Sequence, residues 1–144
     1  MTEIEAAIGL VQTSKIKEIT EKRIRNANIL SYNFEKVEQI NSQYVPENAK
    51  SAYHFYPIMV SNVSRNKLLD FLRGNGIMAA VHYRPVYLFP PHGNLLGLKE
   101  GHCAVSEDIY SRVISLPCHQ GLAEDDMMYI AEKVVEGIER FSGR

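Results

Sequence analysis

The 144-residue sequence predicts an α+β fold, in which a small three-stranded mixed or antiparallel sheet is covered by helices. Three observations lead to this prediction. Helical periodicity dominates both ends of the chain, short segments rich in aromatic and β-branched residues lie between them, and turn residues separate the segments. Two of the predicted strands flank a helix, which favours a parallel pair with a right-handed connection. The third strand inserts most easily between them.

Composition narrows the function classes. The chain is 45% apolar and 23% charged, as in an ordinary globular protein. Sixteen Lys and Arg against seventeen Asp and Glu argue against a protein that binds nucleic acid through its phosphates. No apolar run approaches the ~18 residues of a membrane-spanning helix, and Glu3 and Glu5 lie where a signal peptide would be cationic. We expect one domain over residues 1–144, in the cytoplasm, with neither nucleic acid nor a membrane as partner.

The first 43 residues contain no proline and show apolar residues at i, i+4 and i+7, which predicts helix. Thr13 and Ser14 weaken the pattern, so the segment either bends or forms two helices. Residues 6–11 are apolar all round, and a helix without a polar face is expected to be buried on every side. Because this stretch stands at the N-terminus, either another chain covers it or part of the protein is missing.

The rest of the chain alternates between helices and short strands. The predicted elements in order are a loop over 42–51, a strand over 52–60, a helix from Ser64 that ends at Gly74–Gly76, a strand over 77–83, a connection without regular structure over 84–101, a short helix over 104–110, a strand over 113–116 and a helix over 124–141. Pro57 removes one hydrogen-bond donor, so its strand should be an edge strand or a bulged one. A structureless connection as long as 84–101 is typical of functional or disordered segments.

Two pairs of soft ligands, His102-Cys103 and Cys118-His119, raise the question of zinc. Zinc sites usually space each ligand pair by two or more residues, whereas adjacent side chains point apart in a strand and ~100° apart on a helix. A buried cysteine beside a surface histidine accounts for the pairs better, and no metal site is expected. Two cysteines also cannot form a disulfide framework, which favours a reducing compartment.

The motif Val81-His-Tyr-Arg-Pro85 is the strongest candidate for ligand contact, because it closes a predicted strand and opens the long connection. His82, Tyr83 and Arg84 offer successive hydrogen-bond donors that suit phosphate groups or sugar hydroxyls. The alternative is structural, with Tyr83 packed under the loop and the other two side chains solvated. The sequence provides no carboxylate pair, Gly-x-Ser-x-Gly motif or cysteine context that argues for catalysis.

Several short segments occur in a recognisable order and spacing along the chain. They are Met1–Gln12, Lys22-Arg23, Ser51-Ala-Tyr-His-Phe-Tyr-Pro-Ile58, Gly76-Ile77, Val81–Pro85, Ser115-Leu-Pro117 and Glu124-Asp-Asp126. Together they resemble the C-terminal region of the DegT/DnrJ/EryC1/StrS family. These proteins are pyridoxal-phosphate (PLP)-dependent aminotransferases that act on keto sugars, typically nucleotide-linked. The resemblance implies the fold of the small C-terminal domain of fold-type I PLP aminotransferases.

The resemblance also implies what this chain lacks. In the family, the lysine that binds PLP lies in a large N-terminal domain, and no lysine here stands in the family's Ser-Phe-x-x-x-Lys context. The chain is therefore expected to hold no PLP, to contribute no catalytic residue and to be inactive alone. Its expected partners are the missing large domain, or a chain that carries it, and a second copy in a homo-oligomer. The residues implied to bind the substrate are His82, Tyr83 and Arg84.

Two other function classes remain open from the sequence. One is a free-standing regulatory or protein-interaction module. The other is a small-molecule binder that uses the loop from His82 to Gly101. A partner chain that carries the PLP-binding lysine would favour the aminotransferase, and binding of nucleotide sugars to the chain alone would favour the binder.

Overall fold

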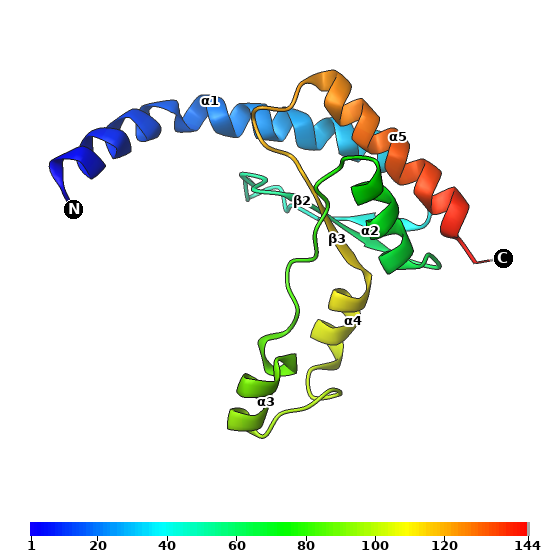
Figure 1. Cartoon of the computed structure of the whole chain (residues 1–144). Helices are drawn as coiled ribbons and strands as arrows, with labels where there is room; N and C mark the ends of the chain where they lie inside the picture. Colours follow the sequence, from blue (N-terminus) through cyan, green and yellow to red (C-terminus); the bar gives the residue numbers. More distant parts are fainter. Residues whose placement is uncertain (144) are drawn as a thin grey trace.

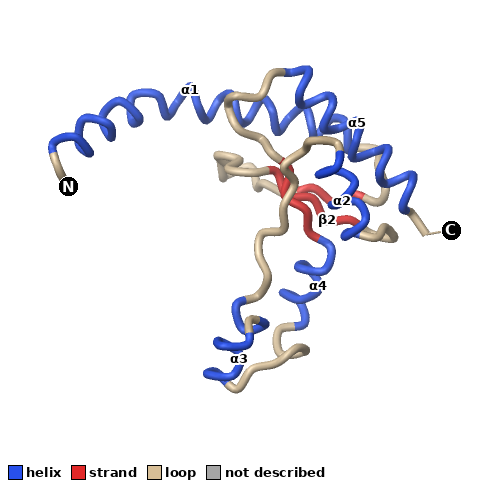
Figure 2. Tube along the Cα trace, viewed as in Figure 1, coloured by secondary structure: helices blue, strands red, loops and turns tan. Residues whose placement is uncertain are grey.

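A computed structural model describes residues 1–143 as a small sheet packed against helices, with two extensions that leave it in different directions (Figure 1). The elements in chain order are α1 (Glu3–Phe34), β1 (Ile40–Ser42), β2 (Tyr56–Val60), α2 (Arg65–Gly74), the 3-10 helix η1 (Val86–Leu88), α3 (Pro90–Leu96), α4 (Ala104–Arg112), β3 (Val113–Leu116) and α5 (Glu124–Phe141). One extension is the first half of α1, and the other contains α3 and α4 (Figure 2). The described chain is thus a crescent, with its inner side between the two extensions.

The α1 helix is continuous over 32 residues. Thr2 caps it: its hydroxyl accepts from the backbone N–H of Glu5 at 3.3 Å, and its own N–H donates to the Glu5 carboxylate at 2.6 Å. The hydroxyls of Thr13 and Ser14 donate to carbonyls one turn earlier, each at 2.8 Å. Both residues are therefore accommodated in one continuous helix, so of the two alternatives, a bend or two helices, the second is wrong.

The helix ends at Phe34 rather than at residue 43, because the chain turns there and pairs with the sheet. The N–H of Val37 donates to the Phe34 carbonyl and that of Ile40 to the Val37 carbonyl, at 3.0 and 2.9 Å. Residues 40–42 then form β1, antiparallel to β2. A three-residue strand is too short to show a pattern in the sequence, so its existence is decided by the neighbouring strand.

The sheet has the order β1-β2-β3, and both neighbouring pairs are antiparallel. The predicted strand over 77–83 is wrong except at Ala80, which makes an isolated antiparallel bridge to Ser115. The Ala79 N–H donates to the Ile77 carbonyl at 2.7 Å, a tight turn that interrupts the extended run. The predicted order around β3 is nevertheless correct, because β3 lies between β2 and Ala80.

Pro57 lies in β2, which is the central strand rather than the predicted edge. Its partner Ser115 exchanges both backbone hydrogen bonds with Ala80 on the other side, at 2.8 and 3.1 Å. The missing N–H of Pro57 therefore points away from β3. On that side, β1 pairs only with residues 58–60, so no ladder bond is lost at Pro57.

One hydrophobic core joins the sheet to α2, α5 and the second half of α1. Its fully buried members include Leu30 of α1, Ile58 of β2, Leu72 of α2, Leu116 of β3 and Val134 of α5. The α2 and α5 helices occupy the predicted ranges and bury the predicted apolar stripes. The α+β class and the three-stranded sheet covered by helices are confirmed.

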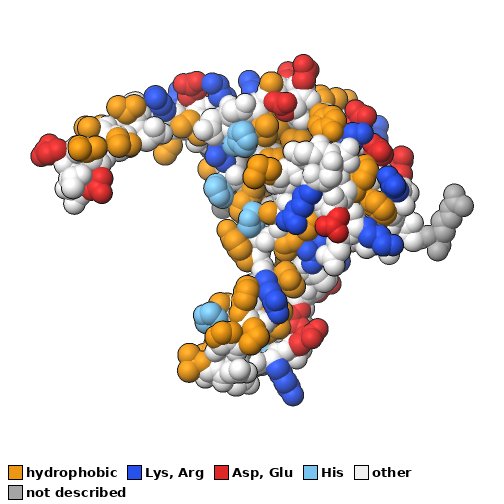
Figure 3. Space-filling model, viewed as in Figure 1, with side chains coloured by type: hydrophobic (Ala, Val, Ile, Leu, Met, Phe, Trp, Pro, Cys, Tyr) orange, Lys and Arg blue, Asp and Glu red, His pale blue; other side chains and the backbone are white. Residues whose placement is uncertain are grey.

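The first half of α1 makes no part of this core. The buried residues of the helix begin at Asn26, whereas Ile4, Ile8 and Val11 are exposed. Orange apolar side chains are visible along this extension in Figure 3. Among the described residues, no helix is long and apolar enough to cross a membrane.

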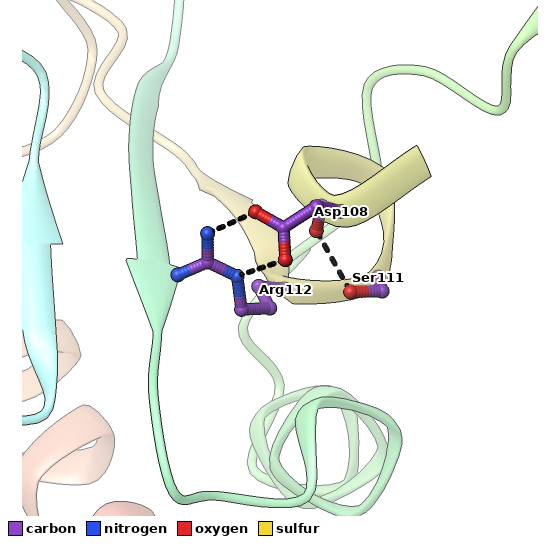
Figure 4. Close-up of polar contacts among 3 residues, drawn as sticks. All are labelled: Asp108, Ser111 and Arg112. Carbon is purple, nitrogen blue, oxygen red and sulfur yellow. Dashed lines mark hydrogen bonds and ion pairs between the residues drawn. The ribbon is translucent and has the colours of Figure 1, made fainter. Parts of the chain in front are cut away.

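The α4 helix leads directly into β3, and a charge pair fixes its last turn. The guanidinium of Arg112 donates two hydrogen bonds to the Asp108 carboxylate, the one from Nε at 3.0 Å, while the Ser111 hydroxyl donates to the Asp108 carbonyl at 2.7 Å (Figure 4). Both ionic side chains are partly exposed, so the pair contributes little to overall stability. Its effect is local, and it orders the turn from which β3 begins.

Candidate functional site

The residues of the His82–Arg84 motif leave the sheet together just beyond the Ala80 bridge. The bridge to Ser115 holds one end of the segment, and the buried Pro85 holds the other. Side chains between two anchored points are held more precisely than those on a free loop. The sequence correctly places these residues before the long connection, but the strand that it predicts through Tyr83 is reduced to the bridge at Ala80.

The His82 ring is the most enclosed part of the motif. It stacks on Phe55 with 4.8 Å between ring centroids and 29° between the ring planes. Its Nδ1 atom is buried and has no hydrogen-bond partner among residues 1–143. A buried ring nitrogen without a partner is unfavourable, which makes it a candidate for a polar group that the described residues do not supply.

Tyr83 and Arg84 differ in what they offer. The Tyr83 side chain is 73% exposed, and its ring centroid lies 4.6 Å from that of His82. The structural alternative, in which Tyr83 packs under the loop, is therefore wrong for this residue. Arg84 instead turns toward the loop itself: its guanidinium donates to the Leu88 carbonyl at 2.7 Å and lies 5.0 Å from the centroid of the Phe89 ring.

Sequence reasoning missed the support beneath these rings. Phe55 contacts His82 on one side and lies 5.4 Å, centroid to centroid, from His54 on the other. Arg23 of α1 donates to the carbonyls of Tyr53 and His54, at 3.0 and 2.8 Å. We call His54, Phe55, His82 and Tyr83 the ring cluster. The aromatic run before β2 was a visible signal for it, but the role of Arg23, thirty residues away, was not.

The connection over 84–101 has regular structure, so the prediction of a structureless segment is wrong. It contains η1 and α3, and the backbone at Gly93 packs so closely that an added Cβ would lie 2.4 Å from the Tyr87 carbonyl oxygen. Glycine is thus required there by close approach rather than by loop flexibility. Tertiary contacts of this kind leave no periodic trace in the sequence.

Glu107 of α4 ties this connection to the helix. Its carboxylate accepts from the Tyr87 hydroxyl at 2.5 Å and from the backbone N–H groups of Gly101 and Cys103, at 2.9 and 3.3 Å. The Tyr87 hydrogen bond, followed by those backbone bonds, lowers the pKa of Glu107. Burial and the same carboxylate raise the pKa of Tyr87. The ionised carboxylate is therefore the form that holds the connection.

Within residues 1–143, no three His, Cys, Asp or Glu side chains converge as metal ligands would. Cys118 is buried beside an exposed His119, as expected for that pair. The same interpretation is wrong for Cys103, which is exposed beside His102. The Cys118 thiol donates to the Arg23 carbonyl at 3.4 Å, and its burial raises its pKa to about 11.

Comparison with known proteins identifies the family. Residues 1–135 match the sequence profile of the DegT/DnrJ/EryC1/StrS aminotransferase family. The chain belongs to this family. A UDP-4-amino-4,6-dideoxy-N-acetyl-beta-L-altrosamine transaminase from Helicobacter pylori is 32% identical over 98% of this chain and 38% of its own length.

Solved structures of the family agree with the fold. Helicobacter pylori PseC, an aminotransferase involved in the biosynthesis of pseudoaminic acid, superimposes with a TM-score of 0.90 at 30% identity, over 98% of this chain and 38% of that protein. A putative sugar aminotransferase from Streptococcus pneumoniae, Spr1654 in its PLP-form, gives a TM-score of 0.91 at 27% identity, over 97% of this chain and 36% of that protein. The chain therefore spans little more than a third of the length of these relatives.

The family is PLP-dependent, but the lysines of this chain do not form a site for PLP. Lys22 and Lys133 are half-buried and form ion pairs on helix surfaces with Glu18 and Glu136, at 2.7 and 2.6 Å. The hydrogen bond that Lys133 donates to Glu136 raises the pKa of Lys133, whereas a lysine that binds PLP needs a lowered pKa in an enclosed site. The remaining lysines are exposed. The residues present do not fit the cofactor.

Proposed function

We propose that this chain is the small C-terminal domain of a PLP-dependent aminotransferase that acts on nucleotide-linked keto sugars. The observation that carries the proposal is the superposition on PseC, which extends over nearly all of this chain but only 38% of that protein. The surface positions of the lysines also support the proposal that PLP binds to another domain and not to this one. Amino transfer then depends on a PLP-binding domain, and the chain alone is inactive.

The substrate contacts that we propose are His82, Tyr83 and Arg84. The unpartnered Nδ1 of His82 and the exposed phenol of Tyr83 lie side by side, and they suit the hydroxyls of a sugar or the oxygens of a diphosphate. Arg84 uses one of its N–H groups on the Leu88 carbonyl and retains others for an anion. In this role the chain forms one wall of the substrate cleft and contributes no catalytic residue.

The PLP-binding domain is also the proposed partner of the first half of α1. Exposed Ile4, Ile8 and Val11 provide the apolar area that such a contact needs. We further propose that the assembled enzyme is a homo-oligomer in the cytoplasm. The two free thiols, Cys103 and Cys118, suit a reducing compartment.

The proposal can be tested by grafting this chain into the Helicobacter pylori transaminase in place of the matching 38% of its length. We expect the graft to bind PLP, measured by absorbance, and to transfer an amino group to the nucleotide keto sugar. The change of His82 to Ala should lower kcat/KM at least tenfold while leaving PLP absorbance unchanged. A matched change of the exposed His92 to Ala should have no effect.

Two results would contradict the proposal. One is a graft that binds PLP and folds, by circular dichroism, but transfers no amino group. The other is a stoichiometric PLP adduct on a lysine of the chain by itself. If the whole graft fails to bind PLP, exchange of residues 76–101 alone tests the same contacts within the relative's own fold.

A further inference from the structure

A groove follows the contact between α1 and α5, away from the ring cluster. Two adjoining cavities of about 600 and 500 Å³ make up the groove, and they share Asn33 and Met128. Asn33 stands at their junction, where its side-chain amide donates to the Ile29 carbonyl at 2.8 Å and contacts the Met128 sulfur at 3.6 Å. Figure 1 shows the two helices side by side over this stretch. We call this feature the α1–α5 groove.

The floor of the α1–α5 groove is apolar. It is lined by Ile24, Ile29, Met128, Ala131 and Val135. At its edge, Tyr32 is 80% exposed, and Met128 itself is 47% exposed. Large apolar side chains left in water on two packed helices are typical of a surface that contacts another protein.

The rim of the groove is acidic. The carboxylates that line it are Glu21, Glu124, Glu132, Glu136 and Glu139, whereas Arg25 is the one cation among the lining residues. Lys133 forms an ion pair with Glu136 at 2.6 Å, and neither Glu132 nor Glu139 forms one within the described residues. The whole chain has a net charge of only −1, so this concentration of negative charge is local.

We propose that the α1–α5 groove docks a basic amphipathic helix of a partner protein. The stretch of α5 from Glu124 to Glu139 is ~22 Å long at 1.5 Å per residue, which accommodates a helix of about 15 residues. The apolar stripe of the partner contacts the floor, and its Lys and Arg side chains pair with the rim. Charge complementarity thus sets both the class of partner and its orientation.

A second copy of this chain fits the groove less well. Its exposed apolar helix is the first half of α1, and that stretch carries Glu3, Glu5 and Glu18 beside Lys15 and Lys17. These charges are mixed and not positive overall, so they complement the acidic rim less well than those of a basic helix. The proposal does not depend on the aminotransferase function, because none of the groove's lining residues belongs to the ring cluster.

The experiment uses the full chain and a labelled synthetic peptide of 16 residues. In the probe, Leu at i, i+3, i+4 and i+7 forms a stripe and Lys occupies the other positions. A control peptide has the same composition with the Leu residues scattered. By fluorescence anisotropy, we expect the striped peptide to bind at least tenfold more tightly than the scattered one, and its affinity to fall as salt is raised.

Matched variants assign the binding to the groove. Glu132→Gln with Glu139→Gln removes two rim charges, and Glu47→Gln with Asp70→Asn removes two exposed charges elsewhere. We expect the first pair to weaken binding severalfold and the second pair to leave it unchanged. Equal affinity for both peptides, an equal effect of both double variants, or no binding of the striped peptide would each overturn the proposal. Circular dichroism checks that the variants retain their helices.

Discussion

Gly137 of α5 packs against side chains of α2, and its replacement tests how tightly these helices are packed. A Cβ at this position would lie 2.4 Å from Leu68 Cδ1 and 3.0 Å from Phe71 Cδ1. Leu68 is fully buried, so its side chain has no open space into which it can turn. By contrast, a Cβ added at Gly9 in α1 would meet nothing within 4 Å.

Replacement by alanine raises helix propensity equally at Gly9 and Gly137, but the two positions differ in how closely neighbouring side chains pack against them. Alanine is more favourable than glycine inside a helix by about 1 kcal/mol. Overpacking of a close-packed core costs about 1–3 kcal/mol. We therefore expect Gly137→Ala to be less stable than Gly9→Ala by about 1–3 kcal/mol, because the difference between the variants leaves mainly the packing cost.

Urea unfolding followed by circular dichroism measures this difference. Gly9→Ala should unfold at the wild-type midpoint or slightly above it, and Gly137→Ala at a clearly lower midpoint with an unchanged slope. If Gly137→Ala equals or exceeds Gly9→Ala in stability, the α2–α5 contact is looser than the structure shows, and the packing argument fails.

Three further expectations follow from single side chains. Asn26→Leu removes the amide that donates to two carbonyls of the 117–123 turn, at 3.0 and 3.4 Å. This change should lower the free energy of unfolding by about 1–3 kcal/mol in a urea titration. An unchanged unfolding midpoint would contradict this. Glu107→Gln should be less stable than the wild type at pH 7. The difference in unfolding free energy between the two proteins should close as the pH falls through the lowered pKa of Glu107, because protonation of the wild-type carboxylate removes the same acceptor. A difference that is constant with pH would refute this. At pH 8 a thiol reagent should modify the exposed Cys103 alone, since Cys118 is 1% exposed and its pKa is raised to about 11 by burial; mass spectrometry that shows two adducts on the folded chain would be inconsistent with this.

Elements with a strong local pattern could be predicted from the sequence. The α5 helix is one example, because Met127, Ile130 and Val134 form an apolar stripe that only a helix brings to one face. The α2 helix is another, since Gly74 is its last residue and the left-handed Gly76 follows it closely. In both cases the information lies within about four residues along the chain, so no knowledge of tertiary contacts is needed.

Elements decided by distant residues could not be predicted. The three residues of β1 become a strand because β2 lies beside them. The strand predicted over 77–83 does not form, because a tight turn at Ala79 interrupts it. The candidate site divides in the same way. His82 and Tyr83 could be singled out from their chemistry and Phe55 from the aromatic run before β2, but the stacking of Phe55 on His82 and the support from Arg23 depend on the fold.

Arg23 connects the exposed part of α1 to the backbone that precedes β2. The twenty residues before it extend ~30 Å along a capped helix outside the core. Arg23 holds the carbonyls of Tyr53 and His54, and its own carbonyl accepts from the Cys118 thiol. Because Arg23 lies where the exposed part of α1 approaches the core, a tilt of that part is expected to act on the backbone that carries His54. A partner that contacts the far end of α1 is thus expected to affect the backbone at Tyr53 and His54 through Arg23.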